Sequence, residues 1–159
     1  MSVRIEPARP EDALAVATML GDLMQEISDS IGVEVFHFDL QQSIDRARHL
    51  IKKGIYHAFL ARDENNGQEV GFITLTEVHA LYAEGAFGLI PELYVRPAYR
   101  CEGIGEALIR QAKTFGTEHG WTRLETTTPP LPEFARSLRF YEWQGFSITG
   151  GHKLKASLL

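Results

Sequence analysis

Two glycines one residue apart, Gly103 and Gly105, stand where a strand-like run, residues 86–95, meets a long helical run, residues 103–119. Unpaired N–H groups at the start of a helix bind phosphate oxygens, and glycine lets the backbone approach a ligand closely. Two glycines alone also fit a plain tight turn. The strand before them, the amphipathic helix after them and the adjacent Arg100 favour a phosphate-binding turn.

Two common phosphate motifs do not match this turn. A P-loop requires Gly-Lys followed by Ser or Thr, whereas Glu106 follows Gly105. A dinucleotide-binding fingerprint requires a third glycine, and that position is Leu108. Glu125 lies about 20 residues beyond Gly105, as a ribose-binding acid would. Because the chain after Gly105 is too short to complete a doubly wound nucleotide domain, we set a nicotinamide oxidoreductase aside.

The pattern of the whole chain predicts one mixed α/β domain over residues 1–159, without linkers or repeats. Strands are expected at residues 3–7, 55–61, 70–78, 86–95 and 121–127, and one or two more within 146–158. Helices are expected at residues 10–27, 39–53, 103–119 and 134–143. Residues 28–38 are expected to be irregular, and Asn65-Asn66-Gly67 predicts a hairpin turn.

Composition and charge limit the classes of partner. The net charge is −5, without a strong basic cluster, which disfavours nucleic acid. The single cysteine, Cys101, excludes an intramolecular disulfide. No apolar run approaches the roughly 18 residues of a membrane helix, and the N-terminus has no signal-peptide core, so a cytoplasmic protein is expected. The six histidines show no metal-ligand spacing, and no metal site is expected.

The run from Arg100 to Gly105 resembles the acetyl-CoA pyrophosphate motif of the GNAT superfamily of N-acetyltransferases: Arg or Gln, two free positions, Gly, one free position, then Gly or Ala. Residues 92–100 resemble the fourth strand and turn of that family. Residues 138–146 resemble its later Phe-Tyr-Glu…Gly-Phe helix, and residues 5–13 resemble its first strand and helix entry. The resemblance covers nearly the whole chain in the expected order.

This resemblance implies a central, mostly antiparallel sheet that is splayed between its fourth and fifth strands, flanked by about four helices, with CoA in the gap. Backbone groups of Leu93 and Val95 would pair with the pantetheine amides. The expected cofactor-binding residues are Leu93, Tyr94, Val95, Arg100, Cys101, Glu102, Gly103, Ile104 and Gly105. Three departures are Cys101 where Gly is frequent, Phe134 where many relatives have Asn, and Pro91 within the cofactor strand.

Two residues are the candidate catalytic groups. Tyr141 lies on the inward face of its helix with Phe134 and Leu138, and in relatives a tyrosine here often protonates the departing CoA thiolate. The alternative is a core tyrosine. Glu92 is the candidate base that deprotonates the amine, and the alternative is an ordinary solvent-facing strand residue. Glu77 is the second choice for the base.

The resemblance implies an enzyme that moves an acetyl group from acetyl-CoA to a primary amine of a small molecule or peptide, by direct attack in a ternary complex. The alternative is a CoA-binding module that senses acetyl-CoA without turnover. By family analogy, residues 28–38 and 79–87 would wall the acceptor side, and a homodimer fits the analogy. Four acids would favour a cationic acceptor: Asp29, Glu34, Asp39 and Glu84.

Overall fold

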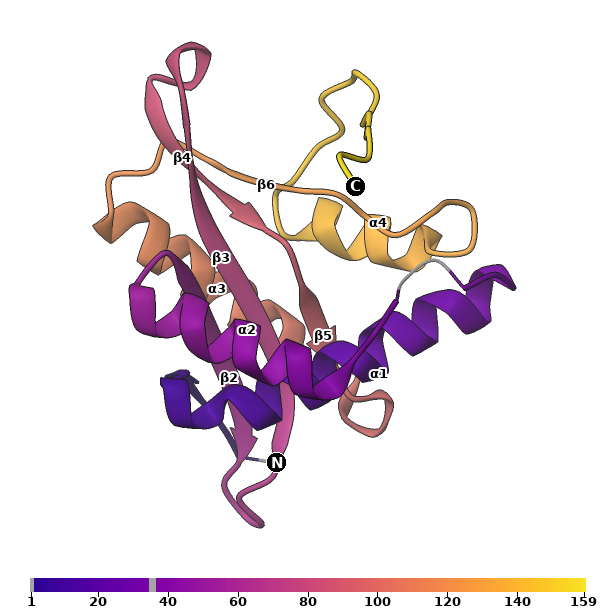
Figure 1. The fold of residues 1–159 in the computed structure, drawn as a ribbon. Coiled ribbons are helices and arrows are strands. Elements are labelled where there is room, and N and C mark those ends of the chain that lie inside the picture. Colours follow the sequence, from indigo (N-terminus) through magenta and orange to yellow (C-terminus); the bar gives the residue numbers. More distant parts are fainter. Residues whose placement is uncertain (1, 35–36) are drawn as a thin grey trace.

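The computed structural model describes residues 2–34 and 37–159, and in this part of the chain six strands and four α-helices form a mixed α/β fold (Figure 1). The elements are β1 (Val3–Pro7), α1 (Ala13–Ile31), α2 (Leu40–Lys53), β2 (Tyr56–Asp63), β3 (Glu69–Ala80), β4 (Gly85–Ile90), β5 (Leu93–Val95), α3 (Ile104–Glu118), β6 (Leu124–Thr126) and α4 (Ala135–Trp143). Short 3₁₀ turns lie at Pro10–Asp12, Leu81–Ala83 and Pro97–Tyr99. The predicted fold class and the predicted number of helices are confirmed.

The sheet has the strand order β1-β2-β3-β4-β6, and every neighbouring pair is antiparallel except β4 and β6, which are parallel. The β4–β6 ladder ends at the pair Ile90 and Thr126. Beyond it the chain continues as β5, which pairs only with β3. The two strands therefore part after this pair, and we call the opening between β5 and the chain beyond β6 the splay.

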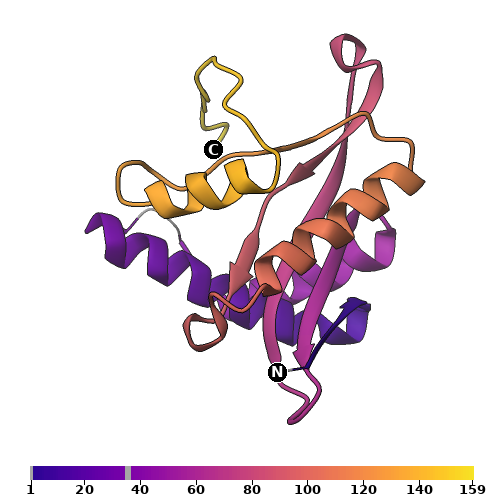
Figure 2. The same ribbon diagram turned by 180° about the vertical axis from the view of Figure 1, so that it is seen from behind.

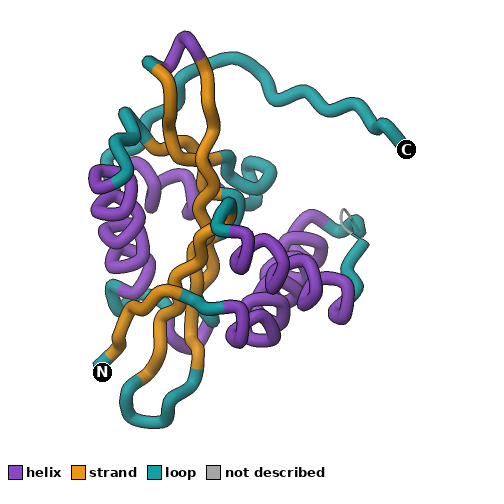
Figure 3. The backbone as a smooth tube through the Cα atoms, turned by 60° about the vertical axis from the view of Figure 1, so that its left-hand side comes forward, coloured by secondary structure: helices purple, strands orange, loops and turns teal. Residues whose placement is uncertain are grey.

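Helices cover both faces of the sheet. Figures 2 and 3 show α3 on one face and α1 with α2 on the other. On the α3 face, Leu108 and Ile109 of the helix pack against Ile73 and Leu75 of β3. The opposite core joins Val16 and Met19 of α1 to members of β2, β3 and β5, namely Ala58, Leu60, Phe72 and Tyr94. These two cores fix the position of β5 from both sides.

Two predicted boundaries were wrong. Residues 28–31 continue α1 as helix, which ends where Gly32 adopts a left-handed conformation with φ of +75°. The rest of the segment predicted to be irregular includes residues 35 and 36, which lie outside the described part. The single strand predicted over residues 86–95 is interrupted between Ile90 and Leu93, because Pro91 offers no ladder donor and Glu92 turns its backbone to β3.

The predicted final strands are also absent from the described structure. Residues 146–159 contain neither helix nor strand. Gly150 and Gly151 both take left-handed conformations, with φ of +89° and +76°, and consecutive residues of this kind cannot continue an extended strand. The segment crosses above α4 without joining the sheet (Figure 1).

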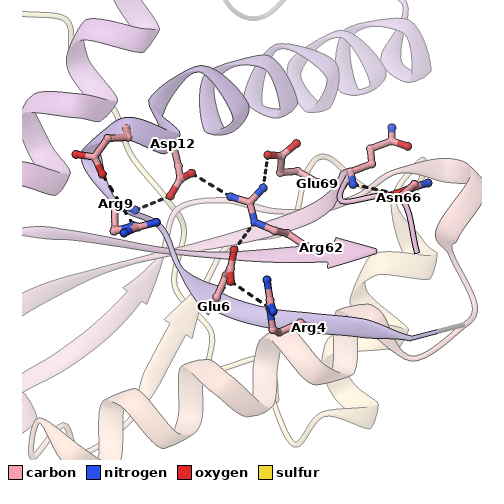
Figure 4. Close-up of polar contacts among 9 residues, drawn as sticks. Arg4, Glu6, Arg9, Asp12, Arg62, Asn66 and Glu69 are labelled. Carbon is pink, nitrogen blue, oxygen red and sulfur yellow. Dashed lines mark hydrogen bonds and ion pairs between the residues drawn. The ribbon is translucent and has the colours of Figure 1, made fainter. Parts of the chain in front are cut away.

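Arg62 on β2 joins the N-terminal elements to the sheet (Figure 4). Its guanidinium forms ion pairs with Glu6 of β1, with Asp12 at the start of α1 (3.0 Å) and with Glu69 of β3 (2.5 Å). The Arg62 side chain is 19% exposed, so solvent screens these pairs only in part. One residue thereby holds β1, β3 and the entry of α1 in register.

Candidate functional site

The turn between β5 and α3 presents a series of free backbone donors. Within residues 2–34 and 37–159, the N–H groups from Cys101 to Glu106 donate to no protein acceptor, and the first bonded one is Ala107 N–H, to Gly103 O at 3.0 Å. The N–H of Arg100 instead donates to Pro97 O at 3.3 Å. Free donors at the positive end of a helix dipole suit a polyanion. This series extends one residue beyond the predicted one, to Glu106.

The residues of this turn have different structural roles. Cys101 and Gly103 have φ of +65° and +85°, and Cys101 is an exposed free thiol. A Cβ on Gly103 would meet no atom within 4 Å, so the backbone there is open to a ligand. A Cβ on Gly105 would lie 3.1 Å from the Phe140 ring, so this glycine also lets α3 approach α4. Glu102 is exposed, while the Ile104 side chain is buried in the core.

The free edge of β5 carries a second set of open backbone groups. The bonds Thr74 N–H to Glu92 O (3.0 Å) and Arg96 N–H to Val70 O (2.8 Å) fix which residues of β5 face β3. Along an antiparallel strand, the N–H and C=O groups of successive residues point alternately toward the neighbouring strand and away from it. Tyr94 therefore pairs with β3, while the N–H and C=O groups of Leu93 and Val95 point into the splay. Val95 O already accepts a hydrogen bond from Arg100 Nε at 2.8 Å, so the open groups are the N–H and C=O of Leu93 and the N–H of Val95.

Helix α1 holds both arginines next to this turn. Arg96 pairs with Asp22 at 3.0 Å, and Arg100 pairs with Glu26 at 2.8 Å. The Arg100 guanidinium also lies 5.7 Å from the centre of the Tyr94 ring, whose side chain is buried against α1. Tyr94 therefore supports the turn through its ring and has no free backbone group for a ligand in the splay.

Glu92 lies in the interruption between strands β4 and β5 and forms hydrogen bonds with residues of β2 and β3. Its Oε1 accepts hydrogen bonds from the hydroxyls of Thr74 (2.8 Å) and Tyr56, and its own N–H donates to Thr74 Oγ1 at 3.0 Å. Burial raises the pKa of the Glu92 carboxyl, against the opposite effect of these two hydroxyls. The Glu92 side chain is half-buried and hydrogen-bonded through one oxygen, whereas an ordinary strand residue that faces solvent would be exposed. Sequence reasoning missed Tyr56 and Thr74, since they are remote from Glu92 in the chain.

Tyr141 approaches the splay from the α3 face of the sheet. Its side chain is 8% exposed and packs in the core with Ile104, Leu108 and Ile90. Burial raises the pKa of the Tyr141 hydroxyl, and the Thr126 hydroxyl, on the last residue of β6, opposes this rise. Glu92 and Tyr94 face the opposite side of the sheet, as strand alternation predicts. Tyr141 and Glu92 thus border the splay from its two faces.

A cavity of about 1190 Å³ lies on the Tyr141 side of the splay. Its lining includes Thr126, Tyr141 and Phe146, together with residues of the C-terminal segment. A smaller cavity of about 500 Å³ at the end of α1 is lined partly by Asp29 and Glu34. The two cavities have no lining residue in common.

Three other candidate residues have structural roles. Glu77 Oε1 accepts from Trp121 Nε1 at 2.5 Å and Glu77 Oε2 pairs with His79 at 3.0 Å, so its carboxylate is held away from β5. Asp39 caps α2 by accepting from Gln42 N–H at 2.8 Å. Glu84 ends the 3₁₀ turn of the β3–β4 hairpin. Figures 1 and 2 show that hairpin tip and the end of α1 on separate parts of the molecule.

In the described part of the chain, no helix has both the length and the apolar character needed to cross a bilayer. The same residues contain no group of three or more His, Cys, Asp or Glu side chains arranged to hold a metal ion.

Sequence comparison finds acetyltransferases as relatives, and the matching domain model covers β5, the turn after it and α4. A sequence model of the acetyltransferase (GNAT) domain matches residues 54–148. An uncharacterized N-acetyltransferase, YhfO of Bacillus subtilis strain 168, is 25% identical over 152 residues, which cover 94% of this chain and 93% of the relative.

Solved structures share the fold at low identity. A ribosomal-protein-alanine N-acetyltransferase from Brucella melitensis biovar Abortus 2308 is 23% identical with a TM-score of 0.73, and the match covers 98% of this chain and 100% of that one. A predicted acetyltransferase with acetyl-CoA from Clostridium acetobutylicum is 14% identical with a TM-score of 0.79, covering 99% and 97%. At these identities the likeness is one of fold.

Proposed function

Because the chain belongs to the GNAT acetyltransferase family, we propose that it is an N-acetyltransferase that moves an acetyl group from acetyl-CoA to a primary amine of a small molecule or peptide. The observation that carries the proposal is two sets of open backbone groups: the N–H and C=O of Leu93 and the N–H of Val95 on β5, and then the N–H groups of the turn from Cys101 to Glu106. Amides along the pantetheine arm and a pyrophosphate require partners of these two kinds in this order.

The turn suits the diphosphate for electrostatic reasons. Its free N–H groups stand at the N-terminus of α3, where the helix dipole favours negative charge. The open space at Gly103 admits phosphate oxygens close to the backbone. Leu93 and Val95 would hold the pantetheine arm in the manner of an added strand, with the thioester near the splay.

Glu92 and Tyr141 then have complementary roles in direct transfer. Near neutral pH only about one alkyl amine in a few thousand is unprotonated, so Glu92 would remove the ammonium proton, directly or through water. The free amine would attack the thioester carbonyl, the carbon–sulfur bond would break, and the proton that the nitrogen loses on becoming an amide would pass to water, from which Tyr141 regains its own. Tyr141 remains protonated because burial raises its pKa, and it would supply the proton that the departing thiolate takes up. Orientation of the amine and the thioester would supply much of the rate.

A cationic acceptor is the class that the acidic side chains favour. Asp29 and Glu34 line the smaller cavity at the end of α1. The net charge of −5 also favours approach of a cation. We therefore propose a polyamine, an aminoglycoside or a peptide amine as the acceptor.

The experiment is a panel of these amines incubated with acetyl-CoA, with free thiol and the mass of the amine product followed together. We expect equal amounts of thiol and N-acetylated product with at least one amine. Acetyl-CoA that raises the melting temperature without being consumed by any amine would identify a sensing module instead, and stabilisation by NAD alone would point to an oxidoreductase.

A further inference from the structure

The hydrogen bonds at Glu92 are confined to one of its two carboxylate oxygens. Oε1 accepts from Thr74 Oγ1 at 2.8 Å and from the Tyr56 hydroxyl. The Thr74 hydroxyl has a single proton, which it donates to Oε1, while its oxygen accepts from Glu92 N–H at 3.0 Å. Backbone and side chain of Glu92 are therefore both tied to Thr74, and Tyr56 supplies the second donor to Oε1.

The other oxygen, Oε2, remains accessible. Among the described residues Oε2 has no hydrogen-bond partner, and every fully buried side-chain nitrogen or oxygen has one. Oε2 therefore retains contact with solvent or with the opening beside it. A carboxylate held through one oxygen and open at the other is oriented for proton transfer at the open one.

We propose that Tyr56 is a positioning residue that, together with Thr74, fixes Glu92 through Oε1 so that Oε2 faces the amine in the splay. This inference rests on the proposed function, because it gives Oε2 the role of accepting the amine proton. Tyr56 comes from the start of β2 and Thr74 from β3, so both donors lie on rigid elements of the sheet.

The two donors also set the basicity of Glu92. A hydroxyl that donates to a carboxylate stabilises its charged form and lowers its pKa, whereas burial raises it. Among the described residues, Tyr56 is the one titratable group that shifts the Glu92 pKa, and burial followed by the Glu92 charge raises the Tyr56 pKa, so Tyr56 stays a donor. Loss of the Tyr56 hydroxyl therefore makes Glu92 harder to deprotonate.

The experiment compares wild type, Tyr56→Phe and Thr74→Val in two measurements. The first is a ¹³C NMR titration of glutamate-labelled protein, with the Glu92 carboxyl assigned by its absence in Glu92→Gln. The second is a pH profile of kcat/KM with one identified amine. We expect the Glu92 pKa and the acid limb of the profile to rise together, by roughly one pH unit in Tyr56→Phe. Thr74→Val is expected to shift both in the same direction.

Tyr99→Phe is the matched control, because the Tyr99 hydroxyl also donates to a carboxylate, Asp63 Oδ2, at 3.2 Å, away from Glu92. It should leave the Glu92 pKa and the acid limb in place. A Glu92 pKa that does not move in Tyr56→Phe overturns the inference while acetyl transfer stands. A pKa that moves while the acid limb does not, or a uniform fall in rate at all pH values, also overturns it. Absence of turnover with every amine refutes the proposed function and the role of Tyr56 with it.

Discussion

At the scale of single residues, Glu92 combines the features expected of a base with a cost in stability. Burial raises its pKa, while the Tyr56 and Thr74 hydroxyls oppose the rise. A raised folded-state pKa means that the native protein holds the Glu92 proton more tightly than the unfolded chain does. The associated stability is present below the ordinary pKa of 4.5 and is lost as the pH rises through the higher folded-state value.

Glu92→Gln is therefore expected to melt above wild type at pH 8, by a few degrees at most, and with a smaller difference at pH 4. A glutamine oxygen accepts the same two hydroxyl bonds without a charge. Thermal unfolding of both proteins at the two pH values provides the measurement. A variant that is less stable than wild type at pH 8 would show that the carboxylate is favourable in the fold.

Tyr141→Phe tests the acid. Because Tyr141 is buried beside Thr126 at the splay, loss of its hydroxyl is expected to lower kcat roughly ten- to a thousand-fold with little change in the KM for acetyl-CoA. Steady-state kinetics at neutral pH, with a melting curve as control, measure both effects. Unchanged kcat with a lower melting temperature would make Tyr141 a core residue alone.

The sequence predicts the side of the strand that Glu92 occupies but not its partners. Alternation places Glu92 and Tyr94 on one face and Leu93 on the other, as observed. Tyr56 and Thr74 meet Glu92 only because β2 and β3 pair in a particular register. A pattern local to one strand contains no information about that register, so these hydroxyls could not be predicted.

At the scale of elements, the turn after β5 is defined by left-handed residues and unpaired donors. Gly103 has φ of +85° and an open surface, whereas Gly105 faces the Phe140 ring. The glycine spacing predicts this turn from the sequence, but it does not reveal that the second glycine also serves helix packing.

Gly103→Ala is expected to weaken CoA binding about ten-fold or more, because its methyl group would occupy the open space at the turn. Gly67→Ala is the matched control. Gly67 also has positive φ (+72°) and no atom within 4 Å of a Cβ, so it takes similar backbone strain, about 1 kcal/mol, in the β2–β3 hairpin. Calorimetric titration with CoA should separate the two variants. Equal affinities would remove the turn from the binding site.

Element boundaries were the least predictable part of the fold. Ser28, Asp29 and Ser30 are weak helix formers, yet α1 continues through them to Ile31. Pro91 is anomalous within a strand, but the sequence alone does not distinguish a bulge from the observed break. The break follows the missing donor of Pro91, whereas α1 continues through the exposed Asp29 and Ser30 against their local preference.

At the scale of the whole molecule, ion pairs to Arg62 join β1, β3 and the entry of α1. Helix α1 in turn holds Arg96 and Arg100 beside the turn that follows β5. The overall α/β order follows from hydrophobic periodicity and turn residues, and these are strong signals in this chain. The extent of the domain, a cytoplasmic location and a homodimeric state stay predictions.

Arg62→Met is expected to lower the free energy of unfolding by about 2 to 4 kcal/mol, because it leaves three carboxylates without their shared partner. Arg48→Met is the control, since Arg48 is 52% exposed and its pair with Asp45 spans 3.6 Å, so the change should stay below about 1 kcal/mol. Urea denaturation measures both. Equal losses would mean that the ion pairs at Arg62 contribute no more than surface ones.

The central claim is direct acetyl transfer from a thioester bound in the splay to an amine. Its most direct test is a single turnover with acetyl-CoA that carries a ¹³C-labelled acetyl group, a cationic amine and excess protein, followed by mass spectrometry of the amine and the intact protein. The account predicts that the label moves onto the amine and that none resides on the protein at any time. A thioester that stays intact, or a label that appears first on Cys101, the single cysteine, would contradict it.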